Sequence, residues 1–237
     1  MKKERIMDKK WSISQSQWQL LLSQCGKELK YGIYFCKEKQ EKRQVIENLY
    51  QMVHRGILLP NREKLVINSE YRRLLELCSE AKKGCFLENK EQIGNLFIYM
   101  GKECVLCEVS AVQKNCFIFS IKKREEILSY LFEIGFFPRY QIESIKEDNQ
   151  QITYSILEKE SWELLSNYKG QKIVTFLDLE RKEKLARLFF SEEEGEEYLI
   201  WEEKNNKGRE LLSEESLKKI WKELVENVVC GSKGTHI

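Results

Sequence analysis

Apolar residues recur along the chain at helical spacing in some segments and at strand spacing in others. The run Ser14-Gln-Ser-Gln17 fits a capping box directly before the apolar-rich segment Trp18–Leu22. This pattern predicts a first helix over about residues 14–28. The β-prone residues Tyr31–Cys36 come next and are expected to form a strand.

A second helix is predicted after the charged run Lys37–Arg43, and Gly56 is a suitable residue to end it. Its apolar positions are Val45, Ile46, Leu49, Tyr50 and Val53. Two short apolar runs within residues 57–67 then flank Pro60-Asn61, which is a turn signal. This segment is therefore predicted to be a β-hairpin.

A third helix and four strands complete the first half of the pattern. Asn68 or Ser69 is expected to cap the helix. A further helix is predicted over Lys122–Glu133, closing at Gly135 and Pro138. Between these two helices lie four β-prone segments, at 85–87, 96–100, 104–109 and 116–121.

The second half repeats this order of elements. Gln141–Ile145 and Gln151–Leu157 predict another hairpin, and a helix carrying Trp162 follows it. Ser213 is expected to cap a last amphipathic helix through Leu217–Val225. The β-prone segments of this half are Lys172–Leu177, 188–190, 198–201 and 211–212.

Parts of the two halves match at a constant shift of ninety positions. Glu70–Leu75 aligns with Glu160–Leu165, and Phe86-Leu87 aligns with Phe176-Leu177. Toward the last helices, the shift between matching positions departs from ninety by a few residues. An internal duplication explains the match, but a mixed α/β chain with regularly spaced helices can produce it as well.

The predicted fold class is α+β, with two pseudo-repeated α/β halves that share a mainly antiparallel sheet flanked by helices. The expected parts are an N-terminal segment and helix (1–40), a first half with a winged-helix-like hairpin (41–138) and a second half with the C-terminal helix (139–237). Together they are expected to form one globular domain.

Composition narrows the classes of function and location. The 237 residues carry 40 Lys and Arg against 38 Asp and Glu, so the net charge of +2 gives no general attraction to nucleic acid or anionic lipid. No apolar run approaches the ~20 residues of a membrane span, and residues 1–10 lack the pattern of a secretory signal. The eight Cys are therefore expected to be reduced thiols in a cytoplasmic protein.

Candidate chemistry in the sequence is sparse. Cys104 and Cys107 have metal or redox spacing, but the sequence holds no second such pair, and a strand would turn the two thiols to opposite faces. His54 is interpreted as a residue at a helix end, and the acidic run 192–197 as a hairpin turn with Gly195 at its tip. We therefore expect no enzyme, no cofactor and no metal, although an enzyme of unfamiliar type and a redox role for the two thiols stay open.

The order helix, Gly, hairpin, helix over Gln44–Cys78 is similar to a winged-helix element. A DNA-reading version needs a basic wing and a basic recognition helix. Asn61–Lys64 carries mixed charge, and Arg72 and Arg73 lie beside Glu70. A DNA-binding regulator is therefore an alternative, and nucleic-acid binding is not the first expectation.

Two groups of aromatic residues are the candidate partner-binding residues. Trp11 and Trp18 flank a polar run, and Phe136 and Phe137 follow a predicted helix end, where loops usually avoid large apolar side chains. These side chains either pack under the sheet or anchor a partner protein.

The layout as a whole resembles the EspG-type chaperones of ESX (type VII) secretion. The resemblance rests on Leu49–Leu58, Leu65–Leu75, the apolar strands at 85–120 and Ile134–Pro138, and it spans about 40–228. These are patterns and not signatures. The family's binding contacts have no match here at the level of residues, and the charged N-terminus and Lys/Glu-rich composition depart from its actinobacterial members.

The resemblance implies binding without chemistry. Such a protein keeps a cytoplasmic secretion substrate, expected to be a helical hairpin with an apolar tip, in soluble form until export. It needs an apolar patch rimmed by charge, and it is expected to be a monomer or a homodimer.

Overall fold

The computed structural model of the chain describes residues 9–26, 41–89, 96–113, 115–137, 172–193, 195–203 and 206–230. The helices within them are α1 (Gln15–Gln24), α2 (Lys42–His54), α3 (Ser69–Glu80), α4 (Ile127–Glu133) and α6 (Glu214–Cys230). The strands are β1 (Lys10–Ser14), β2 (Leu58–Asn61), β3 (Lys64–Ile67), β4 (Lys83–Asn89), β5 (Leu96–Met100), β6 (Glu103–Val109), β7 (Cys116–Lys123), β8 (Lys172–Asp178), β9 (Glu183–Glu193), β10 (Glu196–Glu203) and β11 (Asn206–Leu211).

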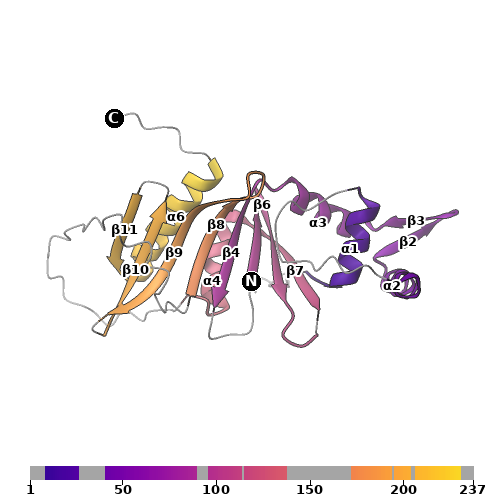
Figure 1. The fold of residues 1–237 in the computed structure, drawn as a ribbon, viewed down its shortest axis with the longest axis horizontal. Coiled ribbons are helices and arrows are strands. Elements are labelled where there is room, and N and C mark those ends of the chain that lie inside the picture. The colour runs from indigo at the N-terminus through magenta and orange to yellow at the C-terminus, as the bar shows by residue number, and fades with distance from the viewer. Residues whose placement is uncertain are drawn as a thin grey trace, which may run out of the picture. The chain divides into compact units, whose positions relative to one another are not determined.

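In these described residues, nine strands form one sheet in the order β1-β7-β6-β5-β4-β8-β9-β10-β11 (Figure 1). The pairs β1–β7, β5–β6, β6–β7, β8–β9, β9–β10 and β10–β11 are antiparallel. Strands β2 and β3 form a separate antiparallel hairpin. The predicted α+β class with a mainly antiparallel sheet is therefore confirmed.

The chain divides into two compact units. Unit 1 comprises Met1–Gly84, Gly94–Arg124 and Leu179–Lys182. Unit 2 comprises Cys85–Ile93, Glu125–Asp178 and Glu183–Ile237. The boundary predicted between residues 138 and 139 falls outside the described residues.

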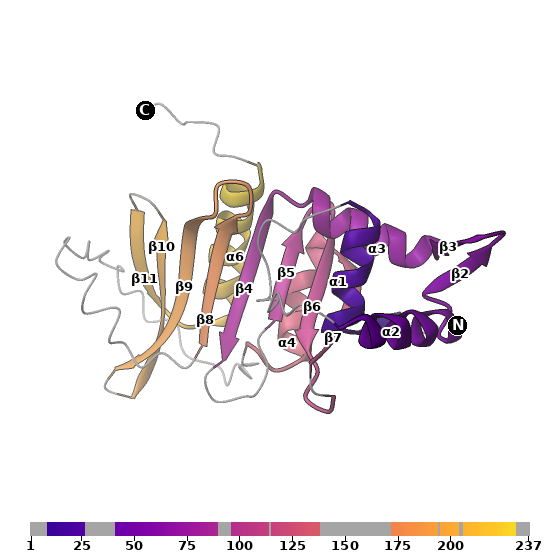
Figure 2. The same ribbon diagram turned by 45° about the vertical axis from the view of Figure 1, so that its right-hand side comes forward.

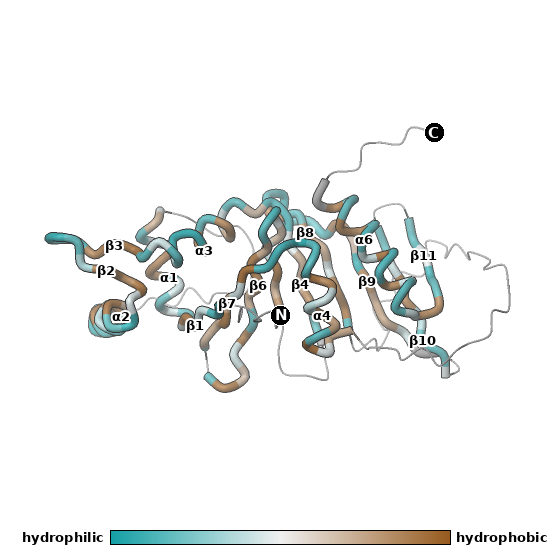
Figure 3. The backbone as a smooth tube through the Cα atoms, turned by 180° about the vertical axis from the view of Figure 1, so that it is seen from behind, coloured by the Kyte–Doolittle hydropathy of each residue, from teal (hydrophilic) through white to brown (hydrophobic). Residues whose placement is uncertain are grey.

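The core of unit 1 is built on strands β1, β7 and β6. Strand β1 pairs with β7, so that Trp11 lies opposite Phe119 and Ile13 opposite Phe117. Helix α1 then packs Trp18 against Phe119, with ring centroids 4.5 Å apart. Helix α3 contacts β6. Figure 2 shows the hairpin β2–β3 extending beyond α2 and α3, and Figure 3 shows that its tip is hydrophilic and its base more hydrophobic.

The core of unit 2 lies between its strands and the helices α4 and α6, which cover the same face of those strands (Figures 1 and 3). Phe137 is the centre of this core and is fully buried. Its ring lies 5.8 Å from Phe132, 5.5 Å from Phe190 and 5.8 Å from Trp221, measured between centroids. These contacts join the loop after α4 to both β9 and α6.

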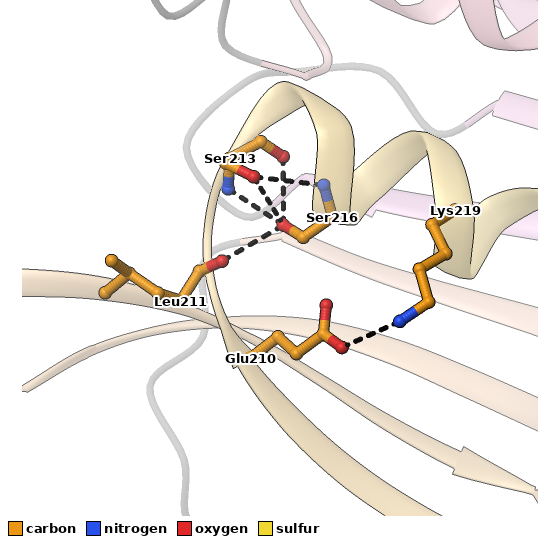
Figure 4. A network of polar contacts seen from close by, with 5 residues as sticks. All are labelled: Glu210, Leu211, Ser213, Ser216 and Lys219. Carbon is orange, nitrogen blue, oxygen red and sulfur yellow. Dashed lines mark hydrogen bonds and ion pairs between the residues drawn. The ribbon is translucent and has the colours of Figure 1, made fainter. Parts of the chain in front are cut away.

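Helix α6 begins with the predicted cap at Ser213 (Figure 4). The Ser216 backbone N–H donates to Ser213 Oγ at 3.0 Å, and the Ser213 N–H donates to Ser216 Oγ at 2.9 Å. Ser216 Oγ also donates to the Leu211 carbonyl at 3.0 Å, and Lys219 Nζ contacts Glu210 Oε1 at 3.2 Å. This reciprocal arrangement is a capping box in which Ser takes the place of Glu or Gln.

Local signals in the sequence predicted most of the described elements. The capping box at the start of α1 is confirmed, since Gln17 N–H donates to Ser14 Oγ at 3.2 Å and Ser14 N–H to Gln17 Oε1 at 3.3 Å. The hairpin with Gly195 at its tip is also confirmed, because this glycine adopts a φ of +85° between β9 and β10. Asn68 caps α3 by accepting a hydrogen bond from the Glu70 N–H at 3.2 Å.

Three local predictions are wrong in detail. Pro60-Asn61 belongs to β2, and the turn is made by Arg62, with a φ of +55°, and Glu63. Lys122 and Lys123 extend β7, because they pair with β6, and α4 starts only after a 3₁₀ turn, at Ile127. The strand β1 lies where the sequence analysis expected no element.

The predicted drift of a few residues toward the last helices is seen in their bounds. Strands β7 and β11 begin ninety positions apart, at Cys116 and Asn206, whereas α4 and α6 begin 87 positions apart, at Ile127 and Glu214. Some buried residues of the two helices still match at ninety positions, as Ile127 does with Leu217 and Leu131 with Trp221. The strand predicted at 31–36, the hairpin at 141–157 and the helix carrying Trp162 lie outside the described residues.

Candidate protein-binding surface

Helix α2 carries apolar side chains on one side and polar side chains on the other, as its sequence predicts. At 100° per residue, Ile46, Tyr50 and Val53 share one side of the helix. Asn48, Gln51 and Arg55 fall on the opposite side. Within α2, all of which is described, Met52 is the buried residue.

The polar side of α2 is the side that faces β1 and α1. Arg55 Nη1 donates to Gln17 Oε1 at 3.1 Å, and Arg55 Nη2 donates to the Ser12 carbonyl. Gln17 Nε2 in turn donates to Gln51 Oε1 at 3.4 Å. Gln17 is only 2% exposed, so these hydrogen bonds satisfy a buried amide. A further bond at 3.3 Å joins the Ser16 hydroxyl to Asn48 Oδ1.

Part of the apolar side of α2 is exposed to solvent. Ile46 is 59% exposed and Tyr50 is 74% exposed, and the four-residue spacing places them next to each other on the helix surface. Leu49 and Val53 beside them are half-buried. A surface helix normally turns its apolar side toward the core, and α2 does so only in part, since Met52 is buried while Ile46 and Tyr50 are exposed. We call Ile46, Leu49, Tyr50 and Val53 the outer face of α2.

Two cations stand at the N-terminal end of the outer face. Lys42 and Arg43 are both exposed and form no ion pair with a described residue. Positive charge in the first turn opposes the helix dipole and costs about 0.3–1 kcal/mol per residue. Helix stability therefore gives no reason for these two residues to be basic.

A second apolar feature of unit 1 is the hairpin β2–β3. Leu59 and Leu65 are 42% and 38% exposed, while Leu58 and Ile67 at the base are buried. Next to it lies a groove of about 490 Å³, formed by the end of α1, by β3 and by α3. Its lining comprises Gln24, Cys25, Leu65, Val66, Ile67, Arg72, Leu75 and Glu76.

The cysteines predicted to be structural lie in the core of unit 1. Cys104 and Cys107 are 0% and 1% exposed, and they lie on β6 opposite Lys122 and Phe119 respectively. Residues three apart on a strand point to opposite faces, so the two thiols diverge. Burial raises the pKa of the Cys107 thiol, which disfavours the thiolate that metal binding and redox chemistry need.

The remaining candidate groups show no convergent chemistry. His54 is exposed as the last residue of α2, in agreement with the role at a helix end. Across the described ranges, no three His, Cys, Asp or Glu side chains gather in a way that could hold a metal ion. None of the helices in the described part of the chain is both long and apolar enough to span a membrane.

The structure places all four aromatic candidates in the interior. Trp18 and Phe137 are fully buried, and Trp11 and Phe136 are 8% and 7% exposed. Packing within the two units accounts for these side chains, and their partner-binding role stays a prediction. The exposure of Ile46 and Tyr50 could not be predicted from the sequence, because helical spacing shows that a helix has an apolar side but not where that side points.

The fold that these elements build is similar to that of a solved chaperone of a type VII secretion system. The chain is similar to the Mycobacterium tuberculosis type VII secretion system chaperone EspG5, whose structure was solved in complex with the PE25–PPE41 dimer. The TM-score is 0.58 at 10% sequence identity, and the match covers 93% of this chain and 97% of EspG5. At this identity the likeness shows a distant EspG-like fold. No protein-family model and no curated protein matches the sequence.

Proposed function

We propose that this chain is a non-enzymatic cytoplasmic binding protein, a chaperone or adaptor that holds a helical secreted protein of a type VII system in soluble form. The observation that carries the proposal is the shared fold over nearly the whole of this chain and of EspG5. EspG5 was solved in complex with a protein dimer, which supports a protein partner here.

The outer face of α2 supports the same proposal on physical grounds. Exposed Ile46 and Tyr50 offer apolar area that binding to another protein would remove from water, a transfer that is favourable by roughly 25 cal/mol per Å² before the costs of association. Binding a client by its apolar surface requires such area with charged residues around it.

The DNA-binding alternative receives no support from the contacts of α3. Arg73 donates to the carboxylate of Glu103 at 2.6 Å, so one of the two arginines of α3, Arg72 and Arg73, is in an ion pair. Glu70 lies on the same helix, in an ion pair with Lys9 at 2.5 Å. A helix that carries Glu70 and has one of its arginines in an ion pair is a poor ligand for phosphates.

The proposal is tested by affinity capture of the tagged chain from the cells that encode it, with washes from 0.1 to 1 M salt. We expect a small helical secreted protein that stays bound at high salt, because apolar contacts are not screened. Co-expression of that protein with this chain should raise its soluble fraction. Recovery of nucleic acid alone, lost as salt rises, would overturn the proposal, as would the absence of any protein at stoichiometric level.

A further inference from the structure

We propose that the outer face of α2 is the docking site for an amphipathic helix of the partner, whose apolar stripe is flanked at one end by acidic side chains. The inference rests on the proposed function and adds which surface binds and what the partner must present. The starting point is the pair Ile46 and Tyr50, which are exposed on α2 while polar residues of the same helix are hydrogen-bonded to α1.

The spacing of the outer face fits a helix. Ile46, Leu49 and Val53 follow each other at intervals of three and four residues, which is the pattern of a helix–helix seam. The stripe from Ile46 to Val53 is on the order of 10 Å long, about two helical turns. A helix offers no unpaired backbone edge to an added strand, and side-chain ridges of a second helix fit between these residues.

The surface is held in place before a partner arrives. Arg55 joins α2 to both Gln17 and the Ser12 carbonyl, and Asn48 accepts a hydrogen bond from Ser16. A preformed surface binds without the cost of ordering it first. This separates the outer face from the hairpin β2–β3, whose exposed Leu59 and Leu65 lie on an element that extends beyond the helices (Figure 2).

Charge determines the direction of the docked helix. Lys42 and Arg43 flank the stripe at its N-terminal end, where both are exposed. Glu47 lies on one flank further along. Carboxylates of the partner are therefore expected next to Lys42 and Arg43, and such complementary pairs set orientation and the rate of association.

The experiment compares four forms of the full chain in capturing the helical protein recovered by the wild type. Ile46→Ser with Tyr50→Ser should weaken capture about tenfold or more, as expected for the loss of central apolar anchors. Lys42→Glu with Arg43→Glu should also weaken capture and reduce its salt dependence. Val109→Ser with Val112→Ser, at exposed apolar positions of unit 1 outside the candidate surface, is the matched control and should stay within about twofold. All replaced residues are exposed, so thermal unfolding of each variant should match the wild type.

A photo-crosslinking amino acid at position 50 identifies the occupant directly. Attachment to an amphipathic segment of the partner with Asp or Glu beside its apolar stripe supports the inference. Attachment to an extended or basic segment, or to a second copy of this chain, overturns it.

The outcomes also separate the two proposals. If the wild type captures the protein and the substitutions at positions 46 and 50 have no effect, the docking site is wrong while the proposed function stands. If the wild type captures no secreted protein, the proposed function fails and the inference fails with it.

Discussion

Adding one methyl group at Gly208 provides a sharp test of the packing in unit 2. Gly208 on β11 lies directly opposite Trp201 on β10, and the indole ring covers the glycine. A Cβ atom at position 208 would lie 1.9 Å from Trp201 Cζ2 and 2.3 Å from Cε2. The φ of Gly208 is not positive, so alanine fits the backbone and the clash with the ring is the whole perturbation.

Two opposing effects decide the size of the change. Overpacking of a packed site costs typically about 1–3 kcal/mol. Replacing glycine by alanine recovers about 0.4–1 kcal/mol, because the unfolded chain loses conformational freedom. Trp201 is half-buried and its ring can move, so we expect Gly208→Ala to lower the free energy of unfolding by about 1 kcal/mol. For a chain of this size that lowers Tm by roughly 2–4 °C.

The assay is a double-mutant cycle read by urea unfolding with circular dichroism. In the Trp201→Ala background the clash is gone, so Gly208→Ala should stabilise the protein by about 0.4–1 kcal/mol instead of destabilising it. The reversal of sign is the diagnostic result. Equal effects of Gly208→Ala in the two backgrounds would refute the packing of Trp201 over Gly208.

Three further predictions concern unit 1. Arg55→Met should lower the free energy of unfolding by about 1–2 kcal/mol, because it removes the charged donor that joins α2 to Gln17, and urea unfolding measures this. Cys78 should react with iodoacetamide only under conditions that unfold the protein, since burial raises the pKa of its thiol. Mass spectrometry of native and urea-treated samples measures this labelling, and rapid labelling of the native protein would contradict the prediction. The hydrogen bond from Lys9 holds the pKa of Glu70 below its usual 4.5 in the folded protein. The stabilisation by the Lys9–Glu70 pair is therefore complete above pH 4.5 and is lost as the pH falls through the pKa that Glu70 has in the folded state. The difference between the urea midpoints of wild type and Glu70→Gln should therefore shrink below pH 4.5, and a difference that grows toward acid contradicts the ion pair.

Signals confined to a few neighbouring residues predicted structure well. The Ser14 and Ser213 caps and the Gly195 turn depend on hydrogen bonds and backbone angles within about four residues, so they can be recognised without knowledge of the rest of the chain. The start of α4 was wrong because Lys122 and Lys123 are helix formers locally but pair with β6 in the sheet. Strand β1 was missed for the same kind of reason, since its partner β7 lies more than a hundred residues away.

The candidate surface shows the same division. The sequence predicted its residues as part of one apolar stripe at helical spacing, comprising Val45, Ile46, Leu49, Tyr50 and Val53. The exposure of Ile46 and Tyr50 was not predicted, because the direction in which a helix faces depends on what its other side contacts. Here that contact is polar, through Arg55 to a buried Gln17, and no periodicity within α2 contains it.

By itself, the sequence determined the capped starts of α1, α3 and α6, the turn at Gly195, the α+β class, and the ninety-position match between parts of the halves. Only the tertiary structure decided the order of the nine described strands, the burial of Trp11, Trp18, Phe136 and Phe137, and the exposure of Ile46 and Tyr50 on α2. The physical reason is the separation along the chain of the residues that each effect involves. Amphipathic spacing and capping act between near neighbours, whereas burial and orientation are decided by surfaces from distant segments that meet only in the folded chain.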